Sequence, residues 1–250
     1  MTWTLDAELS AAARSDVGAA RAWARAPLRA YSVCERFDGL GADGAPKRLG
    51  IMGGTFDPIH IGHLAIADQA REAFSLDAVV FIPAGNPVFK RNREVSLGED
   101  RLAMCRLAVK GNPAFDVSPM EVDRGGDTYT VDTLRELRAH YPENVELFFI
   151  TGADAVAKIC LWRESAAIAG LARFIAVTRP GYELSAATRS ALSCGGAFRI
   201  DMLEATAIGV SSSDLRERVS HGRTIRYLTM GRVLDYIHVR RLYLERGDAR

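Results

Sequence analysis

The sequence predicts an α/β protein with a doubly wound parallel sheet in a single domain and a helical C-terminal segment. Three observations predict this fold class. Strand-like and helix-like segments alternate from residue 47 onward, which is typical of βαβ units. The first apolar run leads into a glycine pair and then into a helix start. No internal repeat is visible after residue 47, which favours one compact domain.

Six short apolar runs are the expected strands. They cover Leu49–Met52, Ala78–Pro83, Phe115–Ser118, Val145–Thr151, Phe174–Thr178 and Phe198–Met202. In a doubly wound sheet, ligands bind beyond the carboxyl ends of the strands, where the strand order reverses. The residues that carry function are therefore expected just after strands.

Helical patterns fill the intervals between these strands. Leu64–Phe74 has helical periodicity. Thr130–Tyr141 has it too, with an apolar stripe formed by Val131, Leu134 and Leu137. Ser96 and Glu99 have the spacing of a capping box ahead of a further helix. The apolar face expected for that helix consists of Leu102, Cys105, Leu107 and Val109.

The composition is that of an ordinary globular domain. Of the 250 residues, 48% are hydrophobic, so a substantial core can be buried. Lys and Arg number 32, against 31 Asp and Glu, which excludes the broad basic surface of a nucleic-acid-binding protein. No stretch approaches the roughly 20 apolar residues that span a bilayer, and no secretory leader is visible. We therefore expect a cytoplasmic protein that binds no membrane.

The four cysteines are widely separated in the sequence. Cys34, Cys105, Cys160 and Cys194 form no C-x-x-C pair, which argues against a zinc cluster or a redox motif. We expect reduced, mostly buried thiols and no metal held by protein ligands.

The chain divides into three parts. Residues 1–47 are rich in Ala, Arg, Asp and Gly and form an N-terminal extension, poorly ordered or partly helical. A helix over Ala7–Arg29 is compatible with a targeting peptide, a partner-binding arm or a loosely ordered extension. Residues 48–245 form the main domain, and residues 246–250 a tail.

The first strand leads into the segment Gly53-Gly54-Thr55-Phe56-Asp57-Pro58-Ile59-His60-Ile61-Gly62-His63. Glycines between a strand and a helix leave backbone N–H groups and the positive end of the helix dipole open to an anion. His60 and His63 are three residues apart, so both rings can lie on one face of the first helical turn. A glycine pair can also be a simple tight turn, and such a histidine can be a capping residue. The combination favours a phosphate site.

A second motif near the C-terminus is Val210-Ser211-Ser212-Ser213-Asp214-Leu215-Arg216. Three hydroxyls at a helix start, followed about one turn later by an arginine, supply donors for phosphate oxygens. The alternative is a capped amphipathic helix, for which one serine would suffice.

Together the two motifs resemble those of the nucleotidyltransferase superfamily, which has a Rossmann-like fold. Three further segments are similar to bacterial nicotinate-nucleotide adenylyltransferases, namely Asp123–Leu134, Thr151–Ala155 and Thr178–Tyr182. The resemblance covers residues 48–245. It implies an enzyme of NAD biosynthesis that couples nicotinate mononucleotide to ATP and releases pyrophosphate.

This reaction needs no nucleophilic side chain, because the attacking group is the substrate's own phosphate, whose second pKa is about 6. The protein must align that phosphate with the α-phosphorus of ATP and neutralise the departing charge. Mg²⁺ would arrive with the ATP phosphates and keep water ligands, so no carboxylate cage is required. By resemblance, the catalytic residues are His60, His63 and Arg216. The ATP-binding residues implied are Gly53, Gly54, Thr55, Phe56, Gly152, Asp154, Arg179, Ser211, Ser212 and Ser213.

The resemblance also implies a binding site for the mononucleotide, formed by Lys90, Tyr129, Thr130 and Trp162. Trp162 would stack on the pyridine ring, although taken alone it is typical of an aromatic at the core edge. Phe89 stands where the family usually has a histidine, which leaves Lys90 to attract the phosphate. The expected partners are ATP and nicotinate mononucleotide, without nucleic acid, in a monomer or small homo-oligomer.

Other functions remain open on the sequence. The second substrate could be nicotinamide mononucleotide or phosphopantetheine, although Trp162 and its context argue against the latter. The chain could also bind ATP as a non-catalytic sensor, which would not need so many groups for a leaving pyrophosphate. An oxidoreductase is disfavoured, because the G-x-G-x-x-G spacing is missing.

Overall fold

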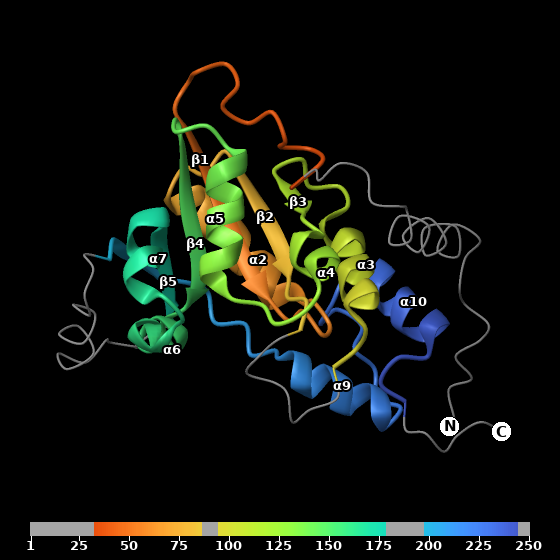
Figure 1. Cartoon of the computed structure of the whole chain (residues 1–250). Coiled ribbons are helices and arrows are strands. Elements are labelled where there is room, and N and C mark those ends of the chain that lie inside the picture. Colours follow the sequence, from red (N-terminus) through yellow and green to blue (C-terminus); the bar gives the residue numbers. More distant parts are fainter. Residues whose placement is uncertain (1–32, 87–94, 179–197, 245–250) are drawn as a thin grey trace.

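The computed structural model describes residues 33–86, 95–178 and 198–244, and its centre is a six-stranded parallel sheet (Figure 1). The strands are β1 (Lys47–Gly54), β2 (Ala78–Pro83), β3 (Phe115–Val117), β4 (Val145–Gly152), β5 (Arg173–Thr178) and β6 (Ile200–Glu204). They lie in the order β3-β2-β1-β4-β5-β6. This order places the switch point between β1 and β4, as in doubly wound nucleotide-binding folds. The predicted Rossmann-like α/β fold is confirmed.

All six predicted strands are present, each within two residues of its predicted ends. β6 is shifted by two residues and runs from Ile200 to Glu204, and β1 extends two residues beyond each predicted end. β2 is buried at every position. Continuous apolar runs like that of β2 are typical of parallel strands covered on both faces, which is why the strands could be recognised from short apolar segments.

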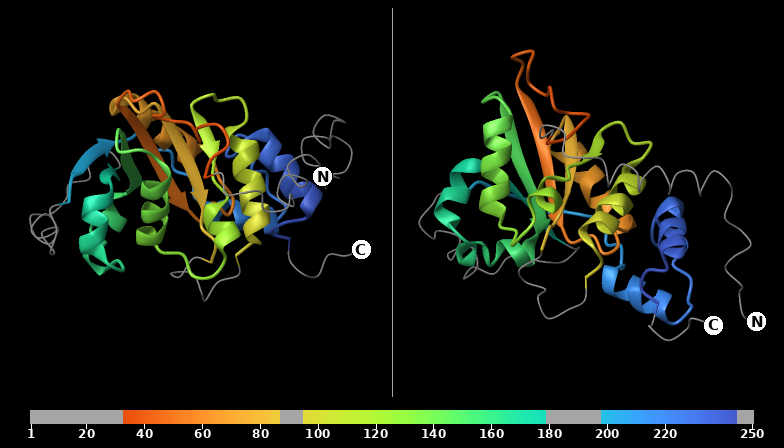
Figure 2. Two further views of the ribbon diagram at one scale, coloured as in Figure 1. Left: turned by 45° about the horizontal axis from the view of Figure 1, so that its top comes forward. Right: turned by 45° about the vertical axis from the view of Figure 1, so that its right-hand side comes forward.

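Helices cover both faces of the sheet (Figures 1 and 2). The first face is packed by α2 (Ile61–Ala73) and α3 (Gly98–Val109), with α10 (Gly231–Arg240) lying against α3. The second face is packed by α5 (Thr130–His140) and α7 (Ser165–Leu171). The remaining helices are short: α4 (Met120–Arg124), α6 (Ala153–Val156), the 3₁₀ helix η3 (Ile159–Leu161) and α9 (Ser212–Ser220). None of the described helices is long and apolar enough to cross a membrane.

The helices predicted within the described residues are present, but one predicted cap is wrong. The stripe of α5 is fully buried at Val131, Leu134 and Leu137. The expected apolar residues of α3 are buried as well. However, Leu97 rather than Ser96 occupies the N-cap of α3, and no side chain caps that helix. Ser96 lies one residue too early, and its backbone N–H donates instead to Oδ2 of Asp57 at 3.3 Å.

Residues 33–46, assigned from the sequence to the extension, pack against the second face of the sheet. They form turns near the start of β1 (Figure 1). Val33 and Cys34 are buried, and Phe37 and Leu40 contact the same core cluster. The amide of Asn144 donates to two carbonyl groups of this stretch. The predicted helix Ala7–Arg29 lies outside the described residues.

The described cysteines differ in whether their thiols are free or form a disulfide. Cys34 and Cys105 are free and buried, as predicted. The prediction of a reduced thiol is wrong for Cys160, which is disulfide-bonded. Separation along the sequence does not measure separation in space, so wide spacing could not exclude a disulfide. Cys194 lies outside the described residues.

Candidate active site

The turn with the two histidines begins directly after β1, at the carboxyl end of the sheet. His60 is the N-cap residue of α2, and His63 lies in its first turn. The two rings stack with their centroids 3.7 Å apart and their planes inclined by 22°. The backbone N–H of His60 donates to Nδ1 of His63 at 3.2 Å. The prediction that both rings share one face of the helix is confirmed.

Burial determines the charge of His60. Its side chain is only 7% exposed, and the desolvation lowers the pKa of His60 from 6.5 to about 4. The ring is therefore neutral at physiological pH. Because Nδ1 of His63 accepts a hydrogen bond, the neutral form of that ring carries its proton on Nε2. A neutral imidazole such as that of His60 can stack closely on its neighbour and still donate an N–H bond to a phosphate oxygen.

Helix α9 lies across the carboxyl end of the sheet and contacts the histidine turn (Figure 1). The Ser212 hydroxyl donates to the carbonyl of Pro58 at 2.9 Å. Nη1 of Arg216 donates to the carbonyl of Asp57 at 2.6 Å. The two predicted phosphate motifs, from opposite ends of the domain, therefore meet at one place.

The three serines of α9 have different contacts. Ser211 caps the helix, because its hydroxyl accepts a hydrogen bond from the N–H of Asp214 at 3.1 Å. Ser213 accepts a bond from Nη2 of Arg216 at 3.3 Å. Ser212 binds the histidine turn instead. A simple capped helix explains only Ser211, so the capping alternative does not account for the other two hydroxyls.

Sequence reasoning missed Arg101, which holds the loops that follow β1 and β2. The side chain is 1% exposed and lies in α3. Its guanidinium donates to four backbone carbonyls, those of Thr55 (3.0 Å), Ala84 (2.6 Å), Gly85 (2.7 Å) and Ser96 (3.0 Å). In the sequence, an arginine beside apolar helix positions is indistinguishable from a solvated one. Only the packing of loop carbonyls around it reveals its role.

The other residues predicted to bind ATP lie along the same edge of the sheet. Gly53 and Gly54 end β1, and Gly152 ends the adjacent strand β4, with Asp154 following in α6. Thr55 is half-buried in the loop after β1. Phe56 is buried, and its ring contacts that of His63 edge to face at 5.0 Å, so it supports that ring. Arg179 lies outside the described residues.

The residues predicted to bind the mononucleotide lie near the start of α5 and after η3. Tyr129 is the N-cap residue of α5, and Thr130 is the first residue of the helix. Trp162 directly follows η3 and packs edge to face against Phe149 at 6.1 Å and Phe174 at 6.3 Å. This packing fits the core-edge interpretation of Trp162, which is nevertheless half-exposed. Lys90 and Phe89 lie outside the described residues.

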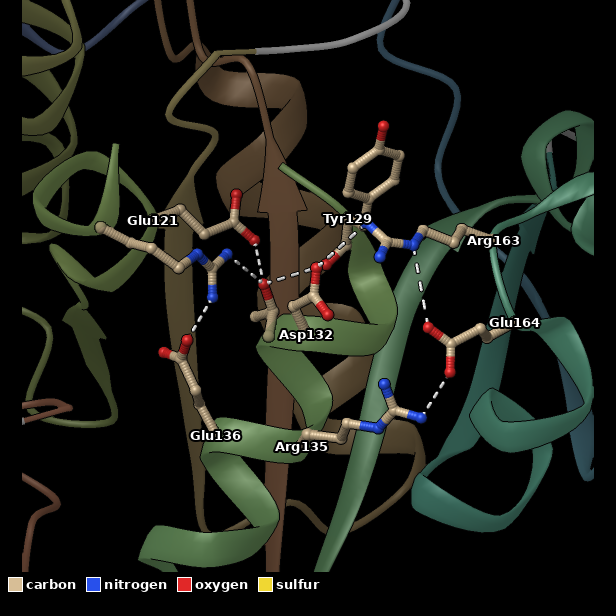
Figure 3. A network of polar contacts seen from close by, with 9 residues as sticks. Glu121, Tyr129, Asp132, Arg135, Glu136, Arg163 and Glu164 are labelled. Atoms are coloured by element: carbon tan, nitrogen blue, oxygen red, sulfur yellow. Dashed lines mark hydrogen bonds and ion pairs between the residues drawn. The ribbon is translucent and has the colours of Figure 1, made fainter. Parts of the chain in front are cut away.

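Charged side chains link the Trp162 segment to α5 (Figure 3). The guanidinium of Arg163 lies 4.6 Å from the centroid of the Tyr129 ring. It also lies 3.9 Å from a carboxylate oxygen of Asp132 and 3.7 Å from one of Glu164. Glu164 in turn pairs with Arg135 at 2.6 Å. Positive charge is therefore held next to Tyr129. In the sequence, nothing beyond the proximity of Arg163 to Trp162 indicated this contact.

A second group in Figure 3 lies between α4 and α5, with Glu121 and Thr133 buried and Arg124 and Glu136 partly exposed. The Thr133 hydroxyl donates to the Glu121 carboxyl group at 2.5 Å. Glu121 is 6% exposed, and burial raises its pKa from 4.5 to about 7, although the bond from Thr133 opposes that shift. Arg124 donates to both Glu136 and Thr133. This group ties α4 to the first half of α5.

The chain is similar to known proteins over most of its length. Residues 51–218 match the family described as Cytidylyltransferase-like. The chain is 49% identical over 201 residues to the probable nicotinate-nucleotide adenylyltransferase of Corynebacterium kroppenstedtii, which covers 80% of this chain and 93% of the relative. It is 53% identical over 192 residues to the protein of the same name from Frankia casuarinae, which covers 77% and 98%.

A solved structure shows the same fold. It is the nicotinic acid mononucleotide adenylyltransferase of Plasmodium falciparum complexed with NaAD, with a TM-score of 0.63 and 17% identity over 79% of this chain and 97% of that one. At this identity the likeness concerns the fold alone, whereas the bacterial relatives share about half of their residues with the chain. On the strength of those relatives, the chain belongs to the nicotinate-nucleotide adenylyltransferase family.

Proposed function

We propose that this protein transfers the adenylyl group of ATP to nicotinate mononucleotide, giving nicotinate adenine dinucleotide and pyrophosphate. The observation that carries the proposal is the meeting of the histidine turn with α9 beyond the carboxyl end of β1. The relatives named above support the choice of substrates. The expected cytoplasmic location and a monomer or small homo-oligomer remain predictions.

The chemistry is a direct in-line displacement. The phosphate of the mononucleotide attacks the α-phosphorus of ATP, the bond to the β-phosphate oxygen breaks, and pyrophosphate leaves with the electron pair. His60 and His63 donate N–H bonds to the triphosphate, and the start of α9 with Arg216 stabilises the departing pyrophosphate. Placing these groups before substrate binds lowers the barrier, because they need no reorganisation as the charge moves.

Arg216 has a second role in this arrangement. Its Nη1 is bound to the Asp57 carbonyl, which fixes the guanidinium beside the histidine turn. Its Nη2 contact with Ser213 is longer, at 3.3 Å, and can be exchanged for a phosphate oxygen. Arg216 thus keeps its position while part of its guanidinium turns to the leaving group.

Mg²⁺ belongs to the proposal as an ion carried by the ATP phosphates. Among the described residues, no group of three or more His, Cys, Asp or Glu side chains could hold a metal ion. The donors present, imidazoles, hydroxyls and a guanidinium, fit phosphate oxygens rather than a bare cation. When bound, the ion would neutralise charge on the phosphates while keeping water ligands.

The preference for the acid over the amide is supported by the charge near Tyr129. The start of α5 presents the positive end of its dipole, and the Arg163 guanidinium lies over the Tyr129 ring. Both favour a pyridine carboxylate over a neutral carboxamide. Trp162 supplies the flat surface for the ring, and Lys90 the charge for the mononucleotide phosphate.

The test is a pyrophosphate-release assay with ATP and one acceptor at a time. We expect release with nicotinate mononucleotide at a higher kcat/KM than with the nicotinamide form, and none above background with phosphopantetheine. Equal or better turnover of the amide would overturn the substrate choice. ATP binding measured by calorimetry without release with any acceptor would identify a sensor instead.

A further inference from the structure

The chain reverses direction after α10 without using glycine. The N–H of Arg241 donates to the carbonyl of His238, and the N–H of Leu242 donates to that of Ile237. This pair of bonds is the Schellman pattern, which usually has glycine at the left-handed position. Here Arg241 has φ +51° and Tyr243 has φ +67°. A left-handed backbone is unfavourable for a residue that has a Cβ atom, so other contacts must hold the turn.

Tyr243 supplies such a contact, and this contact reaches the histidine turn. Its hydroxyl donates to Oδ1 of Asp57 at 2.7 Å, while Oδ2 of Asp57 accepts the N–H of Ser96 at 3.3 Å. Burial, and then the charge of Asp57, raise the pKa of Tyr243 well above 10, so its hydroxyl keeps its proton and acts as donor. The Asp57 carboxylate is buried and therefore requires such donors.

Asp57 connects this tyrosine to the phosphate site. Its carboxylate is held by Tyr243, and its backbone carbonyl accepts the 2.6 Å bond from Arg216. Pro58, the next residue, accepts the bond from Ser212. A displacement of Asp57 would therefore move the acceptors of both side chains that α9 contributes to the turn.

We propose that Tyr243 is a positioning residue for adenylyl transfer: its hydroxyl fixes Asp57 and, through the Asp57 carbonyl, the place of Arg216 beside the triphosphate. The proposal rests on the proposed function. Tyr243 touches neither substrate. It acts through the side chain of Asp57 in the histidine turn. Nothing in the short C-terminal sequence after α10 indicated this role.

The chain offers a matched control in Tyr236. Its hydroxyl donates to Oδ1 of the buried Asp100, also at 2.7 Å. That bond joins α10 to α3, where Arg240 also donates to Asp100, and it does not reach the histidine turn. Tyr236→Phe and Tyr243→Phe thus remove the same type of buried bond at two distances from the site.

The experiment compares Tyr243→Phe, Tyr236→Phe and the unchanged protein. Thermal unfolding gives the midpoint of each protein. The kinetics with ATP and nicotinate mononucleotide, and the calorimetric Kd values for ATP, are then measured well below that midpoint. We expect Tyr243→Phe to lower kcat by about 10-fold with little change in the KM for the mononucleotide, which is less than the roughly 10²-fold expected when a preorganised group itself is removed. Tyr236→Phe should keep kcat within about twofold, whatever it does to the unfolding midpoint.

A double-mutant cycle separates positioning from general weakening. In an Asp57→Asn background, Tyr243→Phe should cause less than about a twofold further loss of kcat, because the two residues act together. Equal losses of kcat in both tyrosine variants, or full additivity in the cycle, would overturn the proposal. If the unchanged protein releases no pyrophosphate, the proposed function fails. The Kd for ATP still tests the role of Tyr243 in that case. A Kd raised in Tyr243→Phe but not in Tyr236→Phe would show that Tyr243 positions the phosphate site, and equal Kd values would show that it does not.

Discussion

The two halves of the active site are held by different kinds of interaction. We call the histidine turn with α9 the phosphate side, and the start of α5 with Trp162–Glu164 the mononucleotide side. On the phosphate side, hydrogen bonds end on backbone carbonyls, including four bound by the buried Arg101. On the mononucleotide side, ion pairs join exposed side chains, with Arg163 53% and Glu164 42% exposed.

This difference separates a rigid half from an adjustable one. Bonds to buried carbonyls are directional, and breaking one leaves an unsatisfied polar group. Exposed ion pairs contribute little free energy and are screened by salt. The phosphate side is therefore set before ATP arrives, whereas the mononucleotide side can rearrange around its ligand. Three predictions test this comparison, and a fourth tests the buried Glu121 of α4, which lies against α5.

The largest effect is expected for the groups that contact phosphate. His63→Ala and Arg216→Ala should each lower kcat by about 10²-fold or more, because preorganised charge stabilisation is lost. Pyrophosphate release measures the rate, and circular dichroism shows whether the fold is intact. Near-normal turnover by either folded variant would remove that residue from the catalytic role.

The next effect concerns the rigidity of the phosphate side. Arg101→Met should lower the free energy of unfolding by about 2–5 kcal/mol, because four buried carbonyls lose their donor. Urea denaturation measures it. The control is Arg71→Met, which removes an exposed pair with Asp68 and should change stability by less than about 0.5 kcal/mol. Similar midpoints for the two variants would contradict a rigid phosphate side.

The third prediction concerns pH. Between pH 4.5 and about 7 the unfolded chain loses the Glu121 proton while the native protein keeps it, so the free energy of unfolding falls as pH rises. The free energy of unfolding falls by about 3 kcal/mol in total, and this fall is complete above about pH 7. Glu121→Gln should remove this fall.

Denaturation of both proteins at several pH values tests that prediction. The buried neutral His60 makes the free energy of unfolding rise with pH between about pH 4, its native pKa, and pH 6.5, its unfolded pKa. In that range only the unfolded chain carries the His60 proton. Subtracting the wild-type curve from that of Glu121→Gln cancels the histidine contribution. A difference independent of pH would show that the pKa of Glu121 is the same in the native and unfolded protein, and so is not raised by burial.

The smallest effect is expected on the mononucleotide side. Arg163→Gln should lower the ratio of kcat/KM for the acid over the amide by about 2–5-fold, as for one exposed charge. Arg135→Gln breaks the neighbouring pair with Glu164 but leaves the guanidinium over Tyr129, so the ratio should stay unchanged. An equal change in both variants would show that loop order, rather than charge, sets the preference.

The sequence could predict the strands and the two phosphate motifs because both are local patterns. Short apolar runs located the strands, and the histidine spacing placed both rings on one face. Buried polar residues could not be predicted in the same way. Arg101 and Asp57 acquire their partners only when distant loops pack around them. The misplaced cap at Ser96 has the same cause, because its N–H is taken by Asp57.

The contacts that complete the phosphate side also determine when it can form. Ser212 and Pro58 are 154 positions apart, and the Thr229 hydroxyl reaches the carbonyl of Ile59 across 170 positions. Closing such long loops is slow, since chain entropy is lost before these contacts form. During synthesis β1 and the histidine turn that follows it emerge early. Helix α9 is made only when nearly the whole chain has followed, so the turn has no partner until then. Capture of ATP during refolding should therefore report the last step of folding, after the sheet itself has formed.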